Sequence, residues 1–321
     1  MRYLVTGGAG FLASALVRRL AAEGHEVTVL DNLSRGRADR IRDIPGVRFI
    51  QGDIRDEDDV CRAIRDCDSV IHYAYIQGTQ TFYAEPKLIL DVALRGILNI
   101  LEACEWAGVR ELLLVSSAEA YEVAQLPTPE TTPLCVPDPL NPRYSYGGGK
   151  LISEITAIAW AQKGYLDRLI IVRPHNIIGP DMRTQHVVPQ FAERMNELTV
   201  KHPEGVIRFP IQGTGNETRS FCYIDDCTDQ FMLLLDKAGP LGIWHVGVMD
   251  ERFIYEVANA VAACYGREIQ VAPGPLPEGS PVRRLPDTGK IRELGYPGPK
   301  VSFAEAIGRT VRWYQENRDD L

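Results

Sequence analysis

Hydrophobic residues lie in short, nearly continuous runs through the first half of the chain, with amphipathic stretches between them. Such runs are typical of parallel strands covered on both faces, since neither side of the strand meets water. The predicted strands span residues 3–6, 27–30, 47–51, 69–73, 112–116 and 169–172. Apolar residues recur at helical spacing over 11–23, 87–107 and 144–162. The pattern therefore predicts an α/β fold.

Alternating strands and helices with right-handed crossovers build a Rossmann-type, doubly wound parallel sheet. After Pro174 proline and glycine become frequent, and longer irregular segments separate the predicted helices. We therefore expect a first, cofactor-binding domain over 1–175 and a smaller, mixed α/β C-terminal substrate lobe over 176–220 and 247–321. The segment at about 221–246 is expected to return to the first domain.

The composition narrows the range of partners. The 321 residues include 35 Lys and Arg against 43 Asp and Glu, a formal net charge of −8. A net-acidic chain without a basic run is a poor candidate for binding nucleic acid, which needs clustered positive charge. No apolar stretch reaches the ~18 residues of a membrane span, and the N-terminus lacks the pattern of a secretory signal. We expect a cytoplasmic protein that binds neither nucleic acid nor a membrane.

The cysteines give no sign of a structural cross-link or a metal. There are seven, an odd number, and no two follow a Cys-x-x-Cys spacing. The pattern predicts neither a disulfide framework nor a metal site.

A glycine-rich stretch, TGGAGFLA at residues 6–13, joins the first predicted strand to the first predicted helix. Glycine suits this turn because the backbone must approach a pyrophosphate closely. The helix N-terminus then offers free N–H groups and the positive end of a dipole. A strand before and a helix after the glycines predict a dinucleotide site. The expected contacts in this stretch are Gly7, Gly10, Phe11 and Leu12.

Asp31 ends the second predicted strand, where it can accept hydrogen bonds from the hydroxyls of an adenosine ribose. A carboxylate there repels a 2′-phosphate, so we expect NAD as the cofactor, while Arg35 and Arg37 leave NADP as the alternative. Asp53 ends the third strand and is placed either to accept from the adenine amino group or to cap a helix. The neighbouring residues expected to contact the cofactor are Asn32 and Ile54.

Tyr146 and Lys150 are four residues apart on one predicted helix and therefore share a face. A free tyrosine has a pKa of about 10, and an ammonium one turn away, together with a cationic nicotinamide, favours the phenolate. The pair alone also fits a solvated helix face. Ser117, however, follows the strand 112–116 at the carboxyl edge of the sheet, where ligands bind in this architecture. It can donate to the substrate hydroxyl that Tyr146 deprotonates.

Seven motifs together resemble the extended short-chain dehydrogenase/reductase family, in particular its nucleotide-sugar epimerases, dehydratases and decarboxylases. They are TGGAGFLA, DNLSRG, GDIRD, SSAEAY, YGGGK, RPHNIIGP and TRSFCYIDD. The resemblance covers essentially the whole chain and implies NAD and a nucleotide-sugar substrate, with a UDP-sugar favoured. It implies that Ser117, Tyr146 and Lys150 form the catalytic set. It further implies diphosphate contacts from Asn176, Arg219 and either Arg283 or Arg284, and a base pocket lined by Phe209 and Ile211.

The sequence departs from the family pattern at two informative places. The usual His-Leu-Ala-Ala after the fourth strand is HYAY at 72–75, which brings Tyr73 and Tyr75 into the cofactor and sugar region. In 4,6-dehydratases an Asp and then a Glu follow the catalytic hydroxyl. Here the first is Ala118 and only Glu119 remains, whereas simple 4-epimerases usually carry no carboxylate there.

The carboxylate that remains, Glu119, favours a dehydratase. In this family the reaction begins when the tyrosine takes the proton of the sugar 4-hydroxyl as carbon 4 is oxidised. The resulting 4-keto sugar has an acidic proton at carbon 5, which Glu119 is placed to remove, and the 6-hydroxyl can then leave. We expect an NAD-dependent 5,6-dehydratase of a UDP-N-acetylhexosamine, with Cys222, Tyr75 or Glu119 itself as proton donor to the leaving hydroxyl.

Other activities stay open. A 4-epimerase would need only the Ser-Tyr-Lys set and a sugar that can rotate, with Glu119 as a structural hydrogen-bond partner. A 3,5-epimerase, the branch that RPHNIIGP and TRSF resemble, would use the same set and add paired acid/base residues at position 119 and in the lobe. A non-catalytic NAD-binding sensor is disfavoured because such sensors typically lose the catalytic tyrosine or lysine, and both are present. The helices 87–107 and 144–162 correspond to those that form a four-helix dimer interface in the family, so the resemblance implies a homodimer. The residues that recur there at helical spacing, which also fits packing against the sheet, are Leu88, Val92, Leu151, Ile155 and Ile158.

Overall fold

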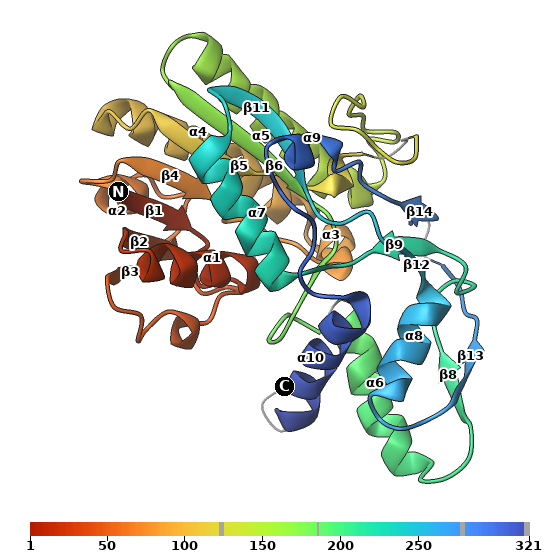
Figure 1. Ribbon diagram of the computed structural model, residues 1–321. Helices are drawn as coiled ribbons and strands as arrows, with labels where there is room; N and C mark the ends of the chain where they lie inside the picture. The colour runs from red at the N-terminus through yellow and green to blue at the C-terminus, as the bar shows by residue number, and fades with distance from the viewer. Residues whose placement is uncertain (122–124, 185, 277–279, 318–321) are drawn as a thin grey trace.

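The computed structural model describes residues 1–121, 125–184, 186–276 and 280–317, and at its centre is a seven-stranded sheet (Figure 1). The strand order is β11-β6-β5-β4-β1-β2-β3, and every neighbouring pair is parallel. The predicted Rossmann-type fold is therefore confirmed. The strands are β1 Arg2–Thr6, β2 Glu26–Asp31, β3 Val47–Gln51, β4 Ser69–His72, β5 Glu111–Val115, β6 Arg168–Pro174 and β11 Leu241–Val246.

Helices cover both faces of this sheet, which explains the nearly continuous apolar runs. In β1, Leu4 packs in the same core as the second set of helices below, whereas Val5 packs on the opposite face with the first set. Successive residues of a strand point to opposite faces, so both must be apolar. The first set is α1 Phe11–Ala22 and α7 Ile224–Lys237, and the second is α2 Glu57–Ile64, α4 Pro86–Ala107 and α5 Ser145–Gln162.

Short helical turns follow the carboxyl ends of the strands and bring polar side chains to that edge of the sheet. They are η1 Ala38–Arg40 after β2, α3 Thr79–Ala84 after β4, and η2 Ala118–Ala120 and η3 Pro142–Tyr144 between β5 and α5. None of the helices in the described parts of the chain is both long enough and apolar enough to cross a membrane.

The C-terminal lobe packs three helices together beside several small sheets (Figure 1). β10 and β7 pair with each other, and the chain then returns through α7 and β11 to the layers of the main sheet. The lobe helices are α6 Val187–Lys201, α8 Ile254–Ala263 and α10 Phe303–Glu316, and α9 Gly289–Glu293 lies beside β11. The small strands are β7 Ile177–Ile178, β8 Ile207–Pro210, β9 Thr218–Ser220, β10 Cys222–Tyr223, β12 Glu251–Phe253, β13 Ile269–Ala272 and β14 Arg283–Arg284.

A buried ion pair ties α5 to the sheet. Arg173 of β6 donates two hydrogen bonds to the Glu154 carboxylate on α5, at 2.9 and 2.5 Å, and both side chains are only 3% exposed. The same guanidinium donates to the Tyr121 hydroxyl and the Glu130 carbonyl. Because α5 carries two of the predicted catalytic residues, this pair fixes the helix on which they stand.

We expect Arg173→Met to lower the free energy of unfolding by about 3–5 kcal/mol, because it leaves the Glu154 charge buried without its partner. Chemical denaturation followed by circular dichroism measures the change. The control is Arg110→Met, which removes an exposed ion pair to Asp167 and should leave unfolding nearly unchanged. Equal effects of the two substitutions would contradict the importance given to the buried pair.

Candidate active site

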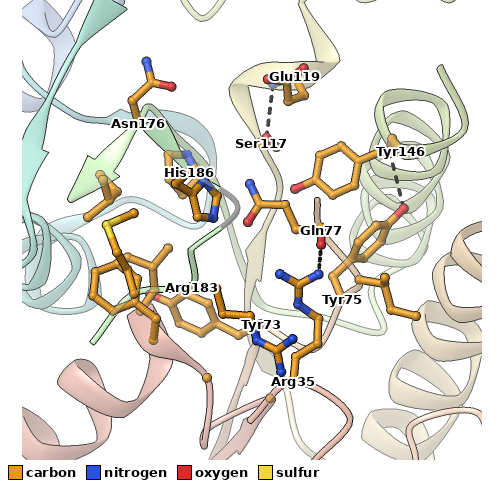
Figure 2. A pocket seen from close by; sticks show the side chains of 18 of the residues that line it. Arg35, Tyr73, Tyr75, Gln77, Ser117, Glu119, Tyr146, Asn176, Arg183 and His186 are labelled. Atoms are coloured by element: carbon orange, nitrogen blue, oxygen red, sulfur yellow. Dashed lines mark hydrogen bonds between the residues drawn. The ribbon is translucent and has the colours of Figure 1, made fainter. Parts of the chain in front are cut away.

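A cavity of about 770 Å³ opens along the carboxyl edge of the main sheet and reaches into the C-terminal lobe (Figure 2). Ligands bind at this position in open α/β sheets. The structure brings most of the predicted site residues to its walls. They are Gly7, Gly10, Phe11, Leu12, Asp31, Asn32, Asp53, Ile54, Tyr73, Tyr75, Ser117, Glu119, Tyr146, Lys150, Asn176, Arg219 and Arg284.

The glycine-rich turn fits a pyrophosphate held by the backbone. Gly7 has a φ of +69°, in the left-handed region, and a Cβ there would lie 2.7 Å from the Cα of Ala74 in the loop after β4. α1 begins at Phe11, and its N-cap, Gly10, has no side chain to bond the first N–H groups of the helix. Both residues line the cavity, so the helix offers it free donors and the positive end of its dipole.

Asp31 lies at the end of β2 with its carboxylate buried against this turn. Its oxygens accept from the N–H groups of Ala9 at 3.0 Å and Leu33 at 2.8 Å. Burial outweighs these bonds and raises the carboxyl pKa. Gly36 packs so closely that a Cβ on it would lie 2.7 Å from Oδ2 of Asp31. Two backbone donors and this close packing therefore fix the position of the carboxylate.

The two arginines that leave NADP as an alternative are turned to other partners. Arg37 pairs with Asp39 at 2.8 Å and with Asp181 at 3.1 Å. The Arg35 guanidinium donates to the backbone carbonyl of Gln77 in the middle of the cavity (Figure 2), and burial lowers its pKa to about 10. The Asp31 carboxylate therefore suits the free ribose hydroxyls of NAD better than a 2′-phosphate.

Asp53 lies at the edge of the cavity as a charged acceptor. It accepts a hydrogen bond from the Asn32 side chain at 2.9 Å and pairs with Arg55 at 2.8 Å. The bond to Arg55 is the main reason that its pKa falls to about 2. The N-cap of α2 is Asp56, whose side chain accepts from the N–H of Asp59, so the alternative role of Asp53 as a helix cap is wrong. Its contact with adenine stays a prediction.

α5 places Tyr146 and Lys150 on its buried side, and both line the cavity. Lys150 Nζ donates to the carbonyl of Val115 at the end of β5, at 2.7 Å, and lies 6.0 Å from the centre of the Tyr146 ring. Burial lowers the Lys150 pKa to about 7 and raises the Tyr146 pKa to about 12, although the Ser117 hydroxyl opposes the rise. Desolvation therefore raises the Tyr146 pKa, opposite to the lowering that the sequence predicts from the neighbouring lysine. Figure 2 shows the Tyr146 hydroxyl turned into the cavity and the Ser117 hydroxyl at the end of a hydrogen bond from the Glu119 N–H, at 3.1 Å.

Glu119 is held by two guanidinium groups. It bonds to Arg284 of the lobe and lies 3.6 Å from the guanidinium of Arg143. Burial alone would raise the Glu119 pKa, but the two positive charges outweigh it and hold the pKa below its usual range. The carboxylate is therefore ionised at neutral pH. Arg143 is a site residue that was not predicted from the sequence. The available signal was its position three residues before Tyr146, about one helical turn away.

The structure separates the two arginines that the sequence could not tell apart. Arg284 is buried and lines the cavity, whereas Arg283 is exposed and pairs with Glu251 at 2.8 Å. Adjacent residues of a strand point to opposite sides, and β14 directs only the second inward. Arg219, on the neighbouring strand β9, has its pKa lowered to about 10 by burial and by Arg284.

Three residues considered for the site lie behind the cavity wall instead. Phe209 is fully buried with its ring edge-on to Phe191, 5.2 Å between centres, and Ile211 is also buried. The cavity is lined instead by Arg194, whose guanidinium lies over the Phe209 ring, and by Gln212, the residue after Ile211. Cys222 is buried outside the cavity, where its thiol donates to the Tyr223 carbonyl. It is therefore not placed to give a proton to a substrate.

Comparisons with known proteins agree on the class of molecule. The model of the NAD dependent epimerase/dehydratase family matches residues 3–247. The chain is 27% identical over 332 residues to a UDP-N-acetyl-alpha-D-glucosaminuronate decarboxylase of Bacillus cytotoxicus, with 99% of each chain covered. It is 31% identical over 323 residues to a UDP-glucose 4-epimerase of Mycolicibacterium smegmatis, covering 98% of this chain and 99% of that one. The crystal structure of a dTDP-glucose 4,6-dehydratase of Streptomyces venezuelae, with NAD bound, matches with a TM-score of 0.87 and 31% identity, covering 99% of this chain and 98% of that one.

We expect Asp31→Ala to weaken NAD binding by about 1–2 kcal/mol, because a charge-assisted hydrogen bond to the ribose is lost. Isothermal titration of the protein after removal of copurified cofactor measures the change. Asp39→Ala is the control, since it removes an exposed carboxylate paired with Arg37 and should leave NAD affinity unchanged. Copurified NADP, identified in a denatured extract, would refute the role given to Asp31.

Proposed function

This chain belongs to the NAD dependent epimerase/dehydratase family, and from that premise we propose that it dehydrates a nucleotide sugar after oxidising it at carbon 4. NAD is its cofactor, as the sequence predicts. The proposed substrate is a UDP-N-acetylhexosamine, and the proposed product carries an alkene between carbons 5 and 6. The observation that carries the proposal is an ionised carboxylate, Glu119, in the cavity that also holds Ser117, Tyr146 and Lys150.

The oxidation is assigned to Ser117, Tyr146 and Lys150. The Tyr146 oxygen accepts the proton of the 4-hydroxyl, and the Ser117 hydroxyl donates to the same substrate oxygen. The positive charge of Lys150 favours the phenolate form of the tyrosine. When bound, NAD takes up and later returns the hydride of carbon 4.

The elimination is assigned to Glu119. The carboxylate takes the proton of carbon 5, which the neighbouring keto group makes acidic, and the electron pair of that bond forms the alkene as the bond from carbon 6 to its oxygen breaks. Of the three candidate proton donors, Cys222 lies outside the cavity, and the Tyr75 hydroxyl donates to the backbone carbonyl of Tyr146 at 3.5 Å. Glu119 itself therefore gives its new proton to the leaving hydroxyl, which departs as water.

The basic side chains of the lobe support a nucleoside diphosphate. Arg219 and Arg284 enter the cavity from neighbouring strands, and guanidinium groups bind phosphate oxygens in pairs. Asn176 Nδ2 is buried without a hydrogen-bond partner among the described residues, so it has a donor to offer. UDP is proposed as the nucleotide because the decarboxylase and the epimerase similar to this chain are named for UDP-sugars.

A 4-epimerase is the second candidate, and the ion pairs of Glu119 favour it. Two guanidinium groups hold the carboxylate, and such pairing lowers its basicity toward carbon 5. In an epimerase Glu119 would only hold Arg143 and Arg284 in place. The 4-keto sugar would then turn in the site and be reduced on its other face.

The Glu119→Gln variant distinguishes a dehydratase from a 4-epimerase. Glutamine keeps the shape but takes no proton, so we expect vinyl product to fall by about 10²–10⁴-fold while carbon 4 is still oxidised. Proton NMR of a reaction with UDP-N-acetylglucosamine follows the vinyl signals. Borodeuteride added to the reaction traps the 4-keto sugar, which gains one deuterium at carbon 4. Tyr146→Phe should yield no trapped keto sugar, because the 4-hydroxyl keeps its proton.

Glu111→Gln is the control for the effect on folding of losing a partly buried ion pair. Glu111 stands at the start of the strand that leads to Glu119 and pairs with Arg168 at 2.8 Å with similar exposure. Vinyl product formed at an undiminished rate by folded Glu119→Gln would show that Glu119 is not the base. A reaction of the unmodified protein that gives no vinyl signals and inverts carbon 4 would contradict the dehydratase proposal and put the 4-epimerase in its place. Unfolding of Glu119→Gln alone would assign the residue a structural role.

We also propose a homodimer formed through α4 and α5, which pack side by side. Ile155, one of the expected interface residues, is exposed, whereas Leu88, Val92 and Ile158 pack against the sheet instead. Apart from Trp106 at the end of α4, the large apolar residues that are exposed on the two helices lie at neighbouring helical positions and form the α4–α5 face. This face consists of Leu90, Leu94, Leu98, Ile152 and Ile155. Exposed apolar surface of this kind typically marks an interface.

Leu94→Glu should convert the dimer to a monomer, because it places a charge in the centre of the α4–α5 face. Light scattering at micromolar concentration measures the mass. Val200→Glu on α6 is the control, since it adds the same charge at an exposed apolar position outside this face. A monomeric unmodified protein would count against the proposed dimer.

A further inference from the structure

Tyr75 lies in the loop after β4, where the sequence departs from the family pattern. The face of its ring covers the ammonium group of Lys150, with Nζ 3.8 Å from the ring centre. The same ammonium group donates to the Val115 carbonyl at 2.7 Å. An aromatic face and a carbonyl therefore both hold the buried positive charge.

The Tyr75 ring is itself fixed. Its hydroxyl donates to the backbone carbonyl of Tyr146, the dashed line at the right of Figure 2. The two tyrosine rings meet edge-on with their centres 5.1 Å apart, and Phe82 stacks on the Tyr146 ring at 4.8 Å. Gly149 makes room for the Tyr75 hydroxyl, because a Cβ there would overlap it. The sequence thus pairs an unusual tyrosine with a glycine that accommodates it.

The other charged and titratable groups around Lys150 give it little direct support. Glu154, one turn further along α5, favours the charged lysine but is bonded to Arg173. His72 of β4 is hydrogen-bonded to Thr6, and burial, with the nearby Lys150 charge, lowers its pKa to about 3, so it is neutral. A cation–π contact strengthens when the cation is desolvated. The ring of Tyr75 is therefore an important partner for this ammonium group.

We propose that Tyr75 is a positioning residue whose ring face keeps the Lys150 side chain charged and in place beside Tyr146. The inference rests on the catalytic role proposed for Tyr146 and Lys150, and it applies equally to a dehydratase and to a 4-epimerase. Without the ring, more of the lysine is neutral at a given pH. The Tyr146 phenolate then loses a favourable charge, so the acidic limb of the oxidation rate moves to higher pH.

Tyr75→Leu and Tyr75→Phe, prepared as holoenzymes, test the proposal. The chain has seven lysines, so ¹³C labelling at Cε gives few NMR signals, and Lys150→Arg identifies the one from Lys150. We expect the Lys150 titration midpoint to fall by about one pH unit in Tyr75→Leu and to stay unchanged in Tyr75→Phe, which keeps the ring. The acidic limb of single-turnover oxidation at carbon 4 should rise by a similar amount in the leucine variant alone.

Fluorinated phenylalanines at position 75 separate the electronic effect from packing. They keep the size of the ring while withdrawing electron density from its face, so the Lys150 midpoint should fall with each added fluorine. An unchanged midpoint across this series and in Tyr75→Leu overturns the inference. A midpoint that moves, in a protein whose unmodified form oxidises no UDP-sugar, supports the role of the ring and contradicts the proposed function.

Discussion

The reactive end of the cavity holds charged groups out of water, and the rest of the site is arranged around that constraint. A buried ammonium, or a carboxylate that is partly buried, loses hydration and must find partners within the protein. Lys150 has a carbonyl and an aromatic ring, and Glu119 has two guanidinium groups. Arg173 has the carboxylate of Glu154. Most of these partners come from different elements, so the contacts that stabilise the charges also fix the geometry of the site.

The main sheet and the lobe contribute different chemistry. The carboxyl end of β5, together with α5, provides the groups that we propose to exchange protons, and β9 and β14 of the lobe provide guanidinium groups. Glu119 follows β5 and is bonded by Arg284 from the lobe. It thus lies between the residues that we propose to oxidise the sugar and the predicted diphosphate contacts, which is where the hexose of a bound nucleotide sugar would lie.

The fold, the family and the centre of the site could be predicted from the sequence because they depend on local patterns. Continuous apolar runs indicate parallel strands, since a strand covered on both faces has no polar side. Glycines between a strand and a helix indicate a phosphate-binding turn. A spacing of four puts Tyr146 and Lys150 on one helix face. Each of these inferences needs only residues that are near one another in the chain.

Only the tertiary structure decided which way neighbouring side chains turn and what they meet across the molecule. Arg284 bonds to Glu119, 165 positions away, while Arg283 beside it faces solvent. The family resemblance implied that Phe209 lines the base pocket, but Phe209 packs behind the cavity wall. On α4, Val92 recurs with Leu88, and Leu94 recurs with Leu90, each at a spacing of four residues. Val92 nevertheless faces the sheet, whereas Leu94 is exposed. Local periodicity determines which residues share a face, but the partner of that face depends on how the sheet and the lobe pack together.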